Sequence, residues 1–120
     1  MIRRETYLTD LERLKDKRFI KVLTGVRRSG KSTLLALFQE QLITDQVSQT
    51  QIQSYNFEDL ALADYLDYRK LYEKITDNLQ ADQMNYLFLD EIQMVPEFER
   101  VLDSLFIKEN VDLYVTGSNA

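Results

Sequence analysis

The sequence contains no cysteine and no histidine, and this absence limits the kinds of site that the protein can form. It excludes disulfides, zinc sites built from cysteine and histidine, and catalysis by a thiolate or an imidazole. A chain without cysteine fits a reducing cytoplasm. The sequence also lacks an apolar run of membrane-spanning length and the apolar N-terminal stretch of a signal peptide. We therefore predict a cytoplasmic protein with no membrane partner.

The composition is otherwise that of one globular domain. With 120 residues, 44% of them hydrophobic and 29% charged, the chain is long enough to bury a core. The formal net charge of −5 argues against a dominant nucleic-acid-binding surface, although it leaves room for a local basic patch. We expect residues 1–120 to form a single domain.

Glycine is scarce, and two of the three glycines stand in one motif. The motif reads Gly25-Val26-Arg27-Arg28-Ser29-Gly30-Lys31-Ser32, which fits the pattern G-x-x-x-x-G-K-[ST] of phosphate-binding loops. The apolar, β-branched segment Phe19–Thr24 predicts a short strand before it, and Thr33–Phe38 predicts the opening of a helix after it. Strand, glycine loop and helix is the order that this motif requires.

The residue types of the loop suit a polyphosphate. Gly25 and Gly30 permit backbone conformations that turn successive N–H groups inward, and the following helix directs its positive end at the same place. Lys31 would reach the β- and γ-phosphates, and the hydroxyl of Ser32 would bind Mg²⁺. We therefore predict that the loop, extended to Thr33, binds a nucleoside triphosphate.

A second informative segment is Asn85-Tyr86-Leu87-Phe88-Leu89-Asp90-Glu91. Its apolar residues run continuously, as expected for a parallel strand covered on both faces. Carboxylates at the end of such a strand are costly unless something uses them. We predict that Asp90 binds Mg²⁺, directly or through water, and that Glu91 orients or deprotonates an attacking water. The alternative is a helix cap or a solvated turn.

The rest of the pattern alternates helices with strands. Apolar stripes predict helices from Thr33 to about Ile43, from Leu60 to Leu79 in two pieces broken around 64–67, and from Pro96 to a stop at Asn110. Strands are predicted over Ile52–Phe57 and Val111–Thr116, and a short helix within Met1–Lys17. Glu58 and Asp59 fit helix capping better than metal binding.

This alternation predicts an α/β protein with a mainly parallel sheet between two helical layers. Ligands of such sheets bind at the carboxyl ends of the strands, where the glycine loop, Asp90-Glu91 and Gly117-Ser118-Asn119 would converge. Asn119 is predicted to hold the attacking water or to touch the γ-phosphate, with a simple turn residue as the alternative.

The motifs together resemble one family, the bacterial and archaeal AAA-type ATPases whose core is followed by a DUF4143 region. The resemblance rests on the arginine pair of the loop, on Leu89-Asp90-Glu91-Ile92-Gln93, on Val115-Thr116-Gly117-Ser118-Asn119 and on Asn56-Phe57-Glu58-Asp59, and it spans about Arg3 to Asn119. It implies a P-loop NTPase fold and ATP with Mg²⁺. It also implies Walker A roles for Lys31 and Ser32, Walker B roles for Asp90 and Glu91, and a sensor-1 role for Asn119 or Ser118.

Members of that family continue through a fifth core strand, a helical lid and a long C-terminal region. The resemblance therefore implies a chain truncated before these parts, which binds ATP-Mg²⁺ weakly and turns it over slowly or not at all. It also leaves room for self-association through the ATPase core. The predicted function is ATP hydrolysis coupled to a conformational change, and the alternative is a nucleotide-gated binding or signalling module with little turnover. A GTPase or small-molecule kinase ranks third, because the Asn-Lys-x-Asp base reader of GTPases does not occur. The protein partner stays open.

Overall fold

The computed structural model describes the backbone of residues 20–23 and 28–117, with the side chains of residues 20–22 and 34–117. The elements are β1 (Lys21–Leu23), α2 (Arg28–Thr44), η1 (Gln49–Gln51), β2 (Ile52–Asn56), η2 (Leu60–Leu66), α3 (Tyr68–Asp77), β3 (Asn85–Asp90), η3 (Ile92–Met94), α4 (Phe98–Phe106) and β4 (Val111–Thr116), where η marks a 3₁₀ helix. The helix predicted within Met1–Lys17 lies outside the described residues.

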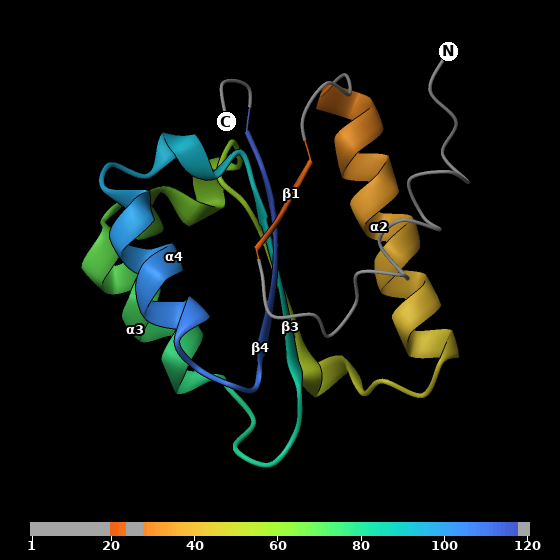
Figure 1. Ribbon diagram of the computed structural model, residues 1–120. Coiled ribbons are helices and arrows are strands. Elements are labelled where there is room, and N and C mark those ends of the chain that lie inside the picture. Colours follow the sequence, from red (N-terminus) through yellow and green to blue (C-terminus); the bar gives the residue numbers. More distant parts are fainter. Residues whose placement is uncertain (1–19, 24–27, 118–120) are drawn as a thin grey trace.

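The four strands form one parallel sheet in the spatial order β1-β4-β3-β2 (Figure 1). Every residue of β3 is buried, as its continuous apolar run predicts for a strand covered on both faces. β4 is the last described strand in the chain, yet it lies between β1 and β3. Because all neighbours are parallel, the carboxyl ends of the four strands meet at one edge of the sheet.

Helices cover both faces of this sheet. Helix α2 lies on one face, and α3 and α4 lie on the other (Figure 1). Successive side chains of β3 point to opposite faces: Phe88 packs beneath α2, whereas Leu87 and Leu89 pack towards α3 and α4. The three-layer α/β/α architecture predicted from the sequence is therefore confirmed.

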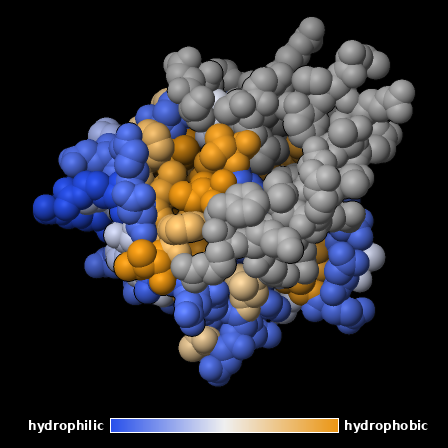
Figure 2. All heavy atoms as spheres, viewed as in Figure 1, coloured by the Kyte–Doolittle hydropathy of each residue, from blue (hydrophilic) through white to orange (hydrophobic). Residues whose placement is uncertain are grey.

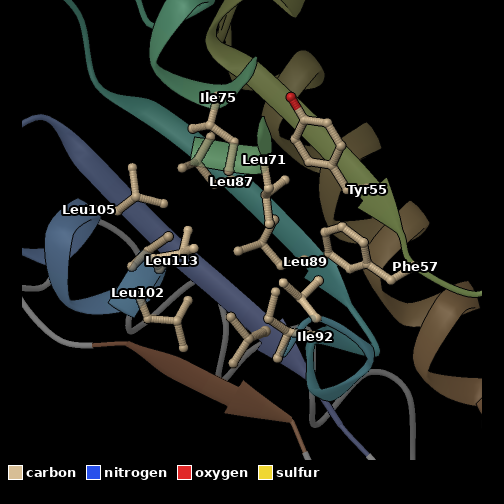
Figure 3. Close-up of a cluster of buried hydrophobic side chains, with 13 residues drawn as sticks. Tyr55, Phe57, Leu71, Ile75, Leu87, Leu89, Ile92, Leu102, Leu105 and Leu113 are labelled. Carbon is tan, nitrogen blue, oxygen red and sulfur yellow. The ribbon is translucent and has the colours of Figure 1, made fainter. Parts of the chain in front are cut away.

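The larger apolar cluster fills the space between the sheet and helices α3 and α4 (Figure 3). Its buried members are Tyr55, Phe57, Leu71, Ile75, Leu87, Leu89, Ile92, Val95, Val101, Leu102, Leu105, Leu113 and Val115. Leu71 and Ile75 belong to the apolar stripe that predicts α3, and both are fully buried. Full burial of such a side chain contributes about 1.5–3 kcal/mol, so this cluster holds α3 against the sheet.

The cluster beneath α2 includes a buried ion pair. The ring of Phe38 lies 6.0 Å from that of Phe88 and 5.1 Å from that of Tyr114, centroid to centroid. Beside Tyr114, the Lys21 ammonium pairs with the Asp112 carboxylate, and both side chains are at most 2% exposed. The Tyr114 hydroxyl donates a hydrogen bond to Asp112 Oδ2 at 2.8 Å. Buried charges are tolerated when they are paired and hydrogen-bonded, and this network joins β1 to β4.

Helix α2 begins earlier than the sequence pattern predicts. The pattern predicts a start at Thr33, but the helical backbone begins at Arg28, inside the glycine motif. Gly30 therefore lies within the helix, where glycine costs about 1 kcal/mol relative to alanine. The apolar face of α2 buries Leu34, Leu35, Phe38 and Leu42, which outweighs that cost.

A Schellman motif ends α2. The N–H of Val47 donates to the Leu42 carbonyl at 2.9 Å, and the N–H of Gln46 donates to the Ile43 carbonyl at 3.1 Å. Gln46 has a φ of 78°, in the left-handed region that favours glycine. Val47 is partly buried against the cluster that contains Leu42, which completes the motif.

The two helical pieces predicted between Leu60 and Leu79 are η2 and α3, and the break falls at Asp67. The Asp67 carboxylate caps α3 by accepting from the N–H of Arg69 at 2.9 Å. The Asp59 carboxylate caps η2 by accepting from the N–H of Ala61 at 2.9 Å. Capping, the favoured interpretation of the acids after β2, is thus confirmed for Asp59.

The start of α4 differs from the prediction. The pattern puts Pro96 in the first turn of this helix, but the helix begins at Phe98. The N–H of Phe98 donates to the Val95 carbonyl at 3.1 Å, which closes a β-turn with Pro96 second and Glu97 third. Glu97 has a φ of 61°, and proline followed by a left-handed residue is typical of a type II turn.

The end of α4 also differs, because the helix stops at Phe106 and not at Asn110. The Asn110 amide instead donates to the Gln80 carbonyl at 3.0 Å, and Asn85 Nδ2 donates to the same carbonyl at 3.0 Å. These bonds join the segments that precede β3 and β4. None of the helices in the described part of the chain is both long and apolar enough to cross a membrane.

Candidate functional site

The carboxyl edge of the sheet is where the candidate site lies. At the end of β1, Leu23 is in register with Thr116 of β4, and at the end of β2, Asn56 is in register with Asp90 of β3. Thr116 and Asp90 are joined by a hydrogen bond between their side chains. The four strand ends therefore form one row. The glycine motif begins two residues after Leu23 in the sequence.

Thr116 connects both acidic residues that follow the apolar run of β3. Its hydroxyl donates to Asp90 Oδ1 and accepts from the backbone N–H of Glu91 at 2.9 Å. The side chain of Thr116 is fully buried, and Asp90 is 7% exposed. Sequence analysis assigned no role to this threonine. The one sequence feature that could have pointed to Thr116 is its place as a polar residue at the end of a mainly apolar strand. The contacts of Thr116, however, depend on the register between β3 and β4.

Glu91 turns the chain sharply after β3. Its backbone is left-handed, with φ 60° and ψ 48°, a conformation that costs a residue with a Cβ roughly 1–2 kcal/mol. The N–H of Met94 donates to the Glu91 carbonyl at 3.1 Å, and this turn opens η3. Strained backbone of this kind persists where surrounding contacts hold it, as Thr116 does here, and it is often found at functional sites.

The Glu91 carboxylate is itself held by a neighbour. Gln93 Nε2 donates to Glu91 Oε1 at 2.8 Å, and Glu91 is only 1% exposed. A hydrogen bond to an ionised acceptor is stronger than one between neutral groups. Sequence analysis quoted Gln93 only as part of a family motif, because a glutamine two residues after an acid carries no signal by itself.

The predicted phosphate loop is described in part. Gly25, Val26 and Arg27 lie outside the described residues. The backbone of Arg28, Ser29, Gly30, Lys31, Ser32 and Thr33 forms the first turns of α2, and their side chains lie outside the described part. Helix α2 begins at the end of the molecule where the strands end (Figure 1). The N–H groups of its first turn, which have no partner within the helix, and its positive dipole end therefore lie at the edge of the sheet that carries Asp90.

The third predicted group, Asn119 with Ser118, lies outside the described residues. Gly117, which precedes them, is described and buried. Among the residues whose sequence-predicted roles concern catalysis or metal binding, the structure thus brings together Asp90 and Glu91. It adds Thr116 and Gln93 to them.

The donor set suits a magnesium ion that arrives with a nucleotide. In the described part of the chain, no group of three or more histidine, cysteine, aspartate or glutamate side chains could hold a metal alone. Mg²⁺ commonly binds through one or two protein oxygens, together with substrate phosphates and water. Asp90, whose carboxylate is oriented by Thr116, fits that requirement.

A pocket lies away from the row of strand ends. Near the outer strand β2, a cavity of about 320 Å³ is lined by nine residues that include Gln53, Tyr55 and Lys74. Burial, with a smaller contribution from Tyr65, raises the pKa of Tyr55 to about 12. This phenol stays neutral at physiological pH and donates to Gln53 Oε1 at 2.5 Å. The cavity contains none of the acidic residues at the strand ends.

Apolar surface is exposed near the middle of the face seen in Figure 2. β1 is the outer strand on this side of the described sheet, and its Val22 is 51% exposed. Val22 is thus one of the few large apolar side chains in the described part of the chain that are half exposed or more.

Comparison with known proteins finds matches that extend over most or all of the chain. A family model described as an AAA domain matches residues 17–120. A protein of Haemophilus influenzae described as uncharacterized is 37% identical over 121 residues. That alignment takes in all of this chain and 30% of the relative, so the chain spans less than a third of the relative's length.

A solved structure supports the fold. The structure of C. elegans PCH-2 superposes with a TM-score of 0.58 and 20% sequence identity, over 96% of this chain and 35% of that one. At this identity the likeness concerns the fold alone. The row of strand ends described above therefore lies in a fold shared with a longer protein.

Proposed function

The chain belongs to the AAA domain family, whose model matches residues 17–120, and on this premise we propose that it is the ATP-Mg²⁺-binding and hydrolysing core of a larger ATPase. Membership supports an ATPase-type function and a P-loop NTPase fold in general terms. One observation carries the finer proposal. Asp90 and Glu91, at the end of a buried parallel strand, are both tied to Thr116 at the end of the next strand.

The phosphate loop supplies the nucleotide-binding part of the proposal. Residues Gly25 to Thr33 bind the phosphates, with Lys31 at the β- and γ-phosphates. The Ser32 hydroxyl and the Asp90 carboxylate are the protein ligands of Mg²⁺. The ion, when bound, neutralises charge on the β- and γ-phosphate oxygens. We propose one nucleotide-binding domain over residues 1–120, which self-associates through this core.

Glu91 and Asn119 have separate roles in the proposed hydrolysis. The water oxygen forms a bond to the γ-phosphorus, and the bond from that phosphorus to the β–γ bridging oxygen breaks, leaving its electron pair on ADP. Glu91 accepts the proton that the water loses and returns it to inorganic phosphate. Asn119 holds the attacking water or the γ-phosphate. A general base of this kind contributes about 10²–10⁴-fold to the rate.

The binding part is tested by titrating ATP-Mg²⁺ into the complete protein that carries this chain, with Lys31→Ala as the variant. We expect the variant to bind at least about tenfold more weakly, because a direct charge contact with the phosphates is lost. Lys70→Ala, an exposed lysine on α3, is the matched control and should bind as the wild type does. Equal affinity in the wild type and in Lys31→Ala would refute the proposal.

The catalytic part is tested with Glu91→Gln, which keeps the shape of the side chain and removes its basicity. We expect steady-state ATP turnover to fall by about 10²–10⁴-fold while ATP affinity stays within about threefold. Glu73→Gln, an exposed position on α3, controls for the loss of one carboxylate. Undiminished turnover in Glu91→Gln would show that this residue does not activate water.

A further inference from the structure

The side chain of Gln93 contacts the carboxylate of Glu91. The 2.8 Å bond from Gln93 Nε2 to Glu91 Oε1 is partly buried and spans only two residues. The amide nitrogen of Gln93 is the donor in this bond, and the carboxylate oxygen of Glu91 is the acceptor. The orientation of the Gln93 amide is thereby fixed, and its oxygen faces away from that carboxylate oxygen.

The Gln93 amide oxygen is a buried acceptor. It is shielded from solvent and accepts no hydrogen bond from any side chain or backbone group in the described part of the chain. Most buried polar atoms in native proteins have a partner, so an acceptor of this kind calls for a functional explanation. Here it belongs to the same amide that holds Glu91.

The backbone of Gln93 is anchored on both sides. Ile92 is 2% exposed, Val95 is fully buried, and both belong to the large apolar cluster between the sheet and helices α3 and α4. The N–H of Val95 donates to the Ile92 carbonyl at 3.0 Å. Together with the bond from Thr116 to the N–H of Glu91, these contacts hold η3 rigidly against the end of the sheet.

The geometry points to Gln93 as a positioning residue for hydrolysis: its amide nitrogen holds the Glu91 carboxylate in the orientation from which that group takes the proton of the attacking water. This inference rests on the proposed function. A carboxylate held in one orientation does not have to reorient before it accepts the proton of the water. Such orientation acts on the catalytic step more than on nucleotide binding.

The test is the steady-state kinetics of Gln93→Met in the complete protein. Methionine matches glutamine in length and flexibility and has neither the amide donor nor the amide acceptor. We expect kcat to fall by about 10–100-fold with KM and ATP affinity within about threefold, the pattern of an interaction made in the transition state. Gln83→Met, an exposed glutamine before β3, is the matched control and should keep wild-type kinetics.

Two further variants separate positioning from a structural role. Gln93→Glu keeps the length but places a like charge beside Glu91, and we expect kcat to fall at least as far as in Gln93→Met. The double variant Glu91→Gln with Gln93→Met should be no slower than Glu91→Gln alone, because the two residues act as a unit. Thermal unfolding of each variant establishes that it is folded at the assay temperature.

The outcomes distinguish this inference from the function on which it rests. If the wild type hydrolyses ATP and Glu91→Gln does not, but Gln93→Met keeps kcat within twofold, the inference is wrong and the proposed function stands. Full multiplication of the two losses in the double variant would also overturn it. If the wild type shows no turnover, or if Glu91→Gln is as active as the wild type, the proposed function itself fails.

Discussion

At the scale of single residues, the hydroxyl of Thr116 serves two acidic neighbours at once. It donates to Asp90 and accepts from the N–H of Glu91, and all three residues are buried. Thr116→Val preserves the shape of the side chain but leaves a buried donor and a buried acceptor without this partner. We expect the free energy of unfolding to fall by about 1–3 kcal/mol in urea titrations.

Thr44→Val is the control for that substitution. The exposed Thr44 hydroxyl donates to the Glu40 carbonyl at 3.1 Å within α2, so its loss should change the unfolding free energy by no more than about 0.5 kcal/mol. If Thr116→Val were no more destabilising than Thr44→Val, the hydroxyl would not hold the end of β3 as described.

The sequence alone identifies Asp90 and Glu91 because two acids closing an apolar strand are conspicuous. It does not identify Thr116, whose contacts reach across 25 and 26 residues and depend on strand register. It assigns no role to Gln93 either, because a glutamine two residues after an acid carries no signal by itself, and only the folded chain shows the bond between them. Residues that act through spatial neighbours carry little signal in sequence order.

At the scale of elements, strands are predicted better than helix ends. β4 matches its predicted bounds, because a segment rich in β-branched and aromatic residues lies between two turn-forming residues, Asn110 and Gly117. The start of α2 and both ends of α4 differ from the prediction, since helix ends depend on local turns. Pro96 favours a β-turn as readily as a first helical turn, and only the bond from Phe98 to Val95 decides between them.

The end of α2 offers a stabilising substitution. Gln46 occupies the left-handed position of the Schellman motif, where its Cβ is unfavourable and glycine is preferred. Gln46 is exposed, so removal of its side chain loses little packing. We expect Gln46→Gly to raise the free energy of unfolding by up to about 1 kcal/mol, measured by urea denaturation.

Ala36→Gly, in the same helix, should change the free energy of unfolding in the opposite direction. Ala36 is exposed in the interior of α2, where glycine should lower the free energy of unfolding by about 1 kcal/mol. Changes of opposite sign at these two positions would establish that backbone conformation decides the effect. Destabilisation at both would contradict the left-handed conformation of Gln46.

At the scale of the whole molecule, one buried ion pair joins distant parts of the chain. Lys21 of β1 and Asp112 of β4 are separated by 91 residues. Lys21→Met removes the cation that pairs with the buried Asp112 carboxylate, and breaking a buried ion pair typically costs about 3–5 kcal/mol. Because domains are stable by only about 5–15 kcal/mol in total, we expect a large fall in the thermal midpoint of the entire protein domain.

A second substitution, at Asp112, should recover much of the stability that Lys21→Met loses. In Lys21→Met with Asp112→Asn, no uncompensated charge is buried and the amide oxygen at residue 112 still accepts from Tyr114. The double variant should therefore unfold at a higher temperature than Lys21→Met alone, as followed by circular dichroism. A double variant less stable than the single one would mean that packing at Lys21, and not charge pairing, sets the cost.

The place of β4 between β1 and β3 also affects how the protein folds during synthesis. Lys21 leaves the ribosome 91 residues before Asp112, which at about 5–20 residues per second means a delay of roughly 5–20 seconds. β2 and β3 can pair during this time, but β1 has to wait for β4. A charged residue in an unpaired strand discourages contact with other strands. We therefore expect the lysine that is buried in the finished sheet to discourage aggregation of the newly made chain.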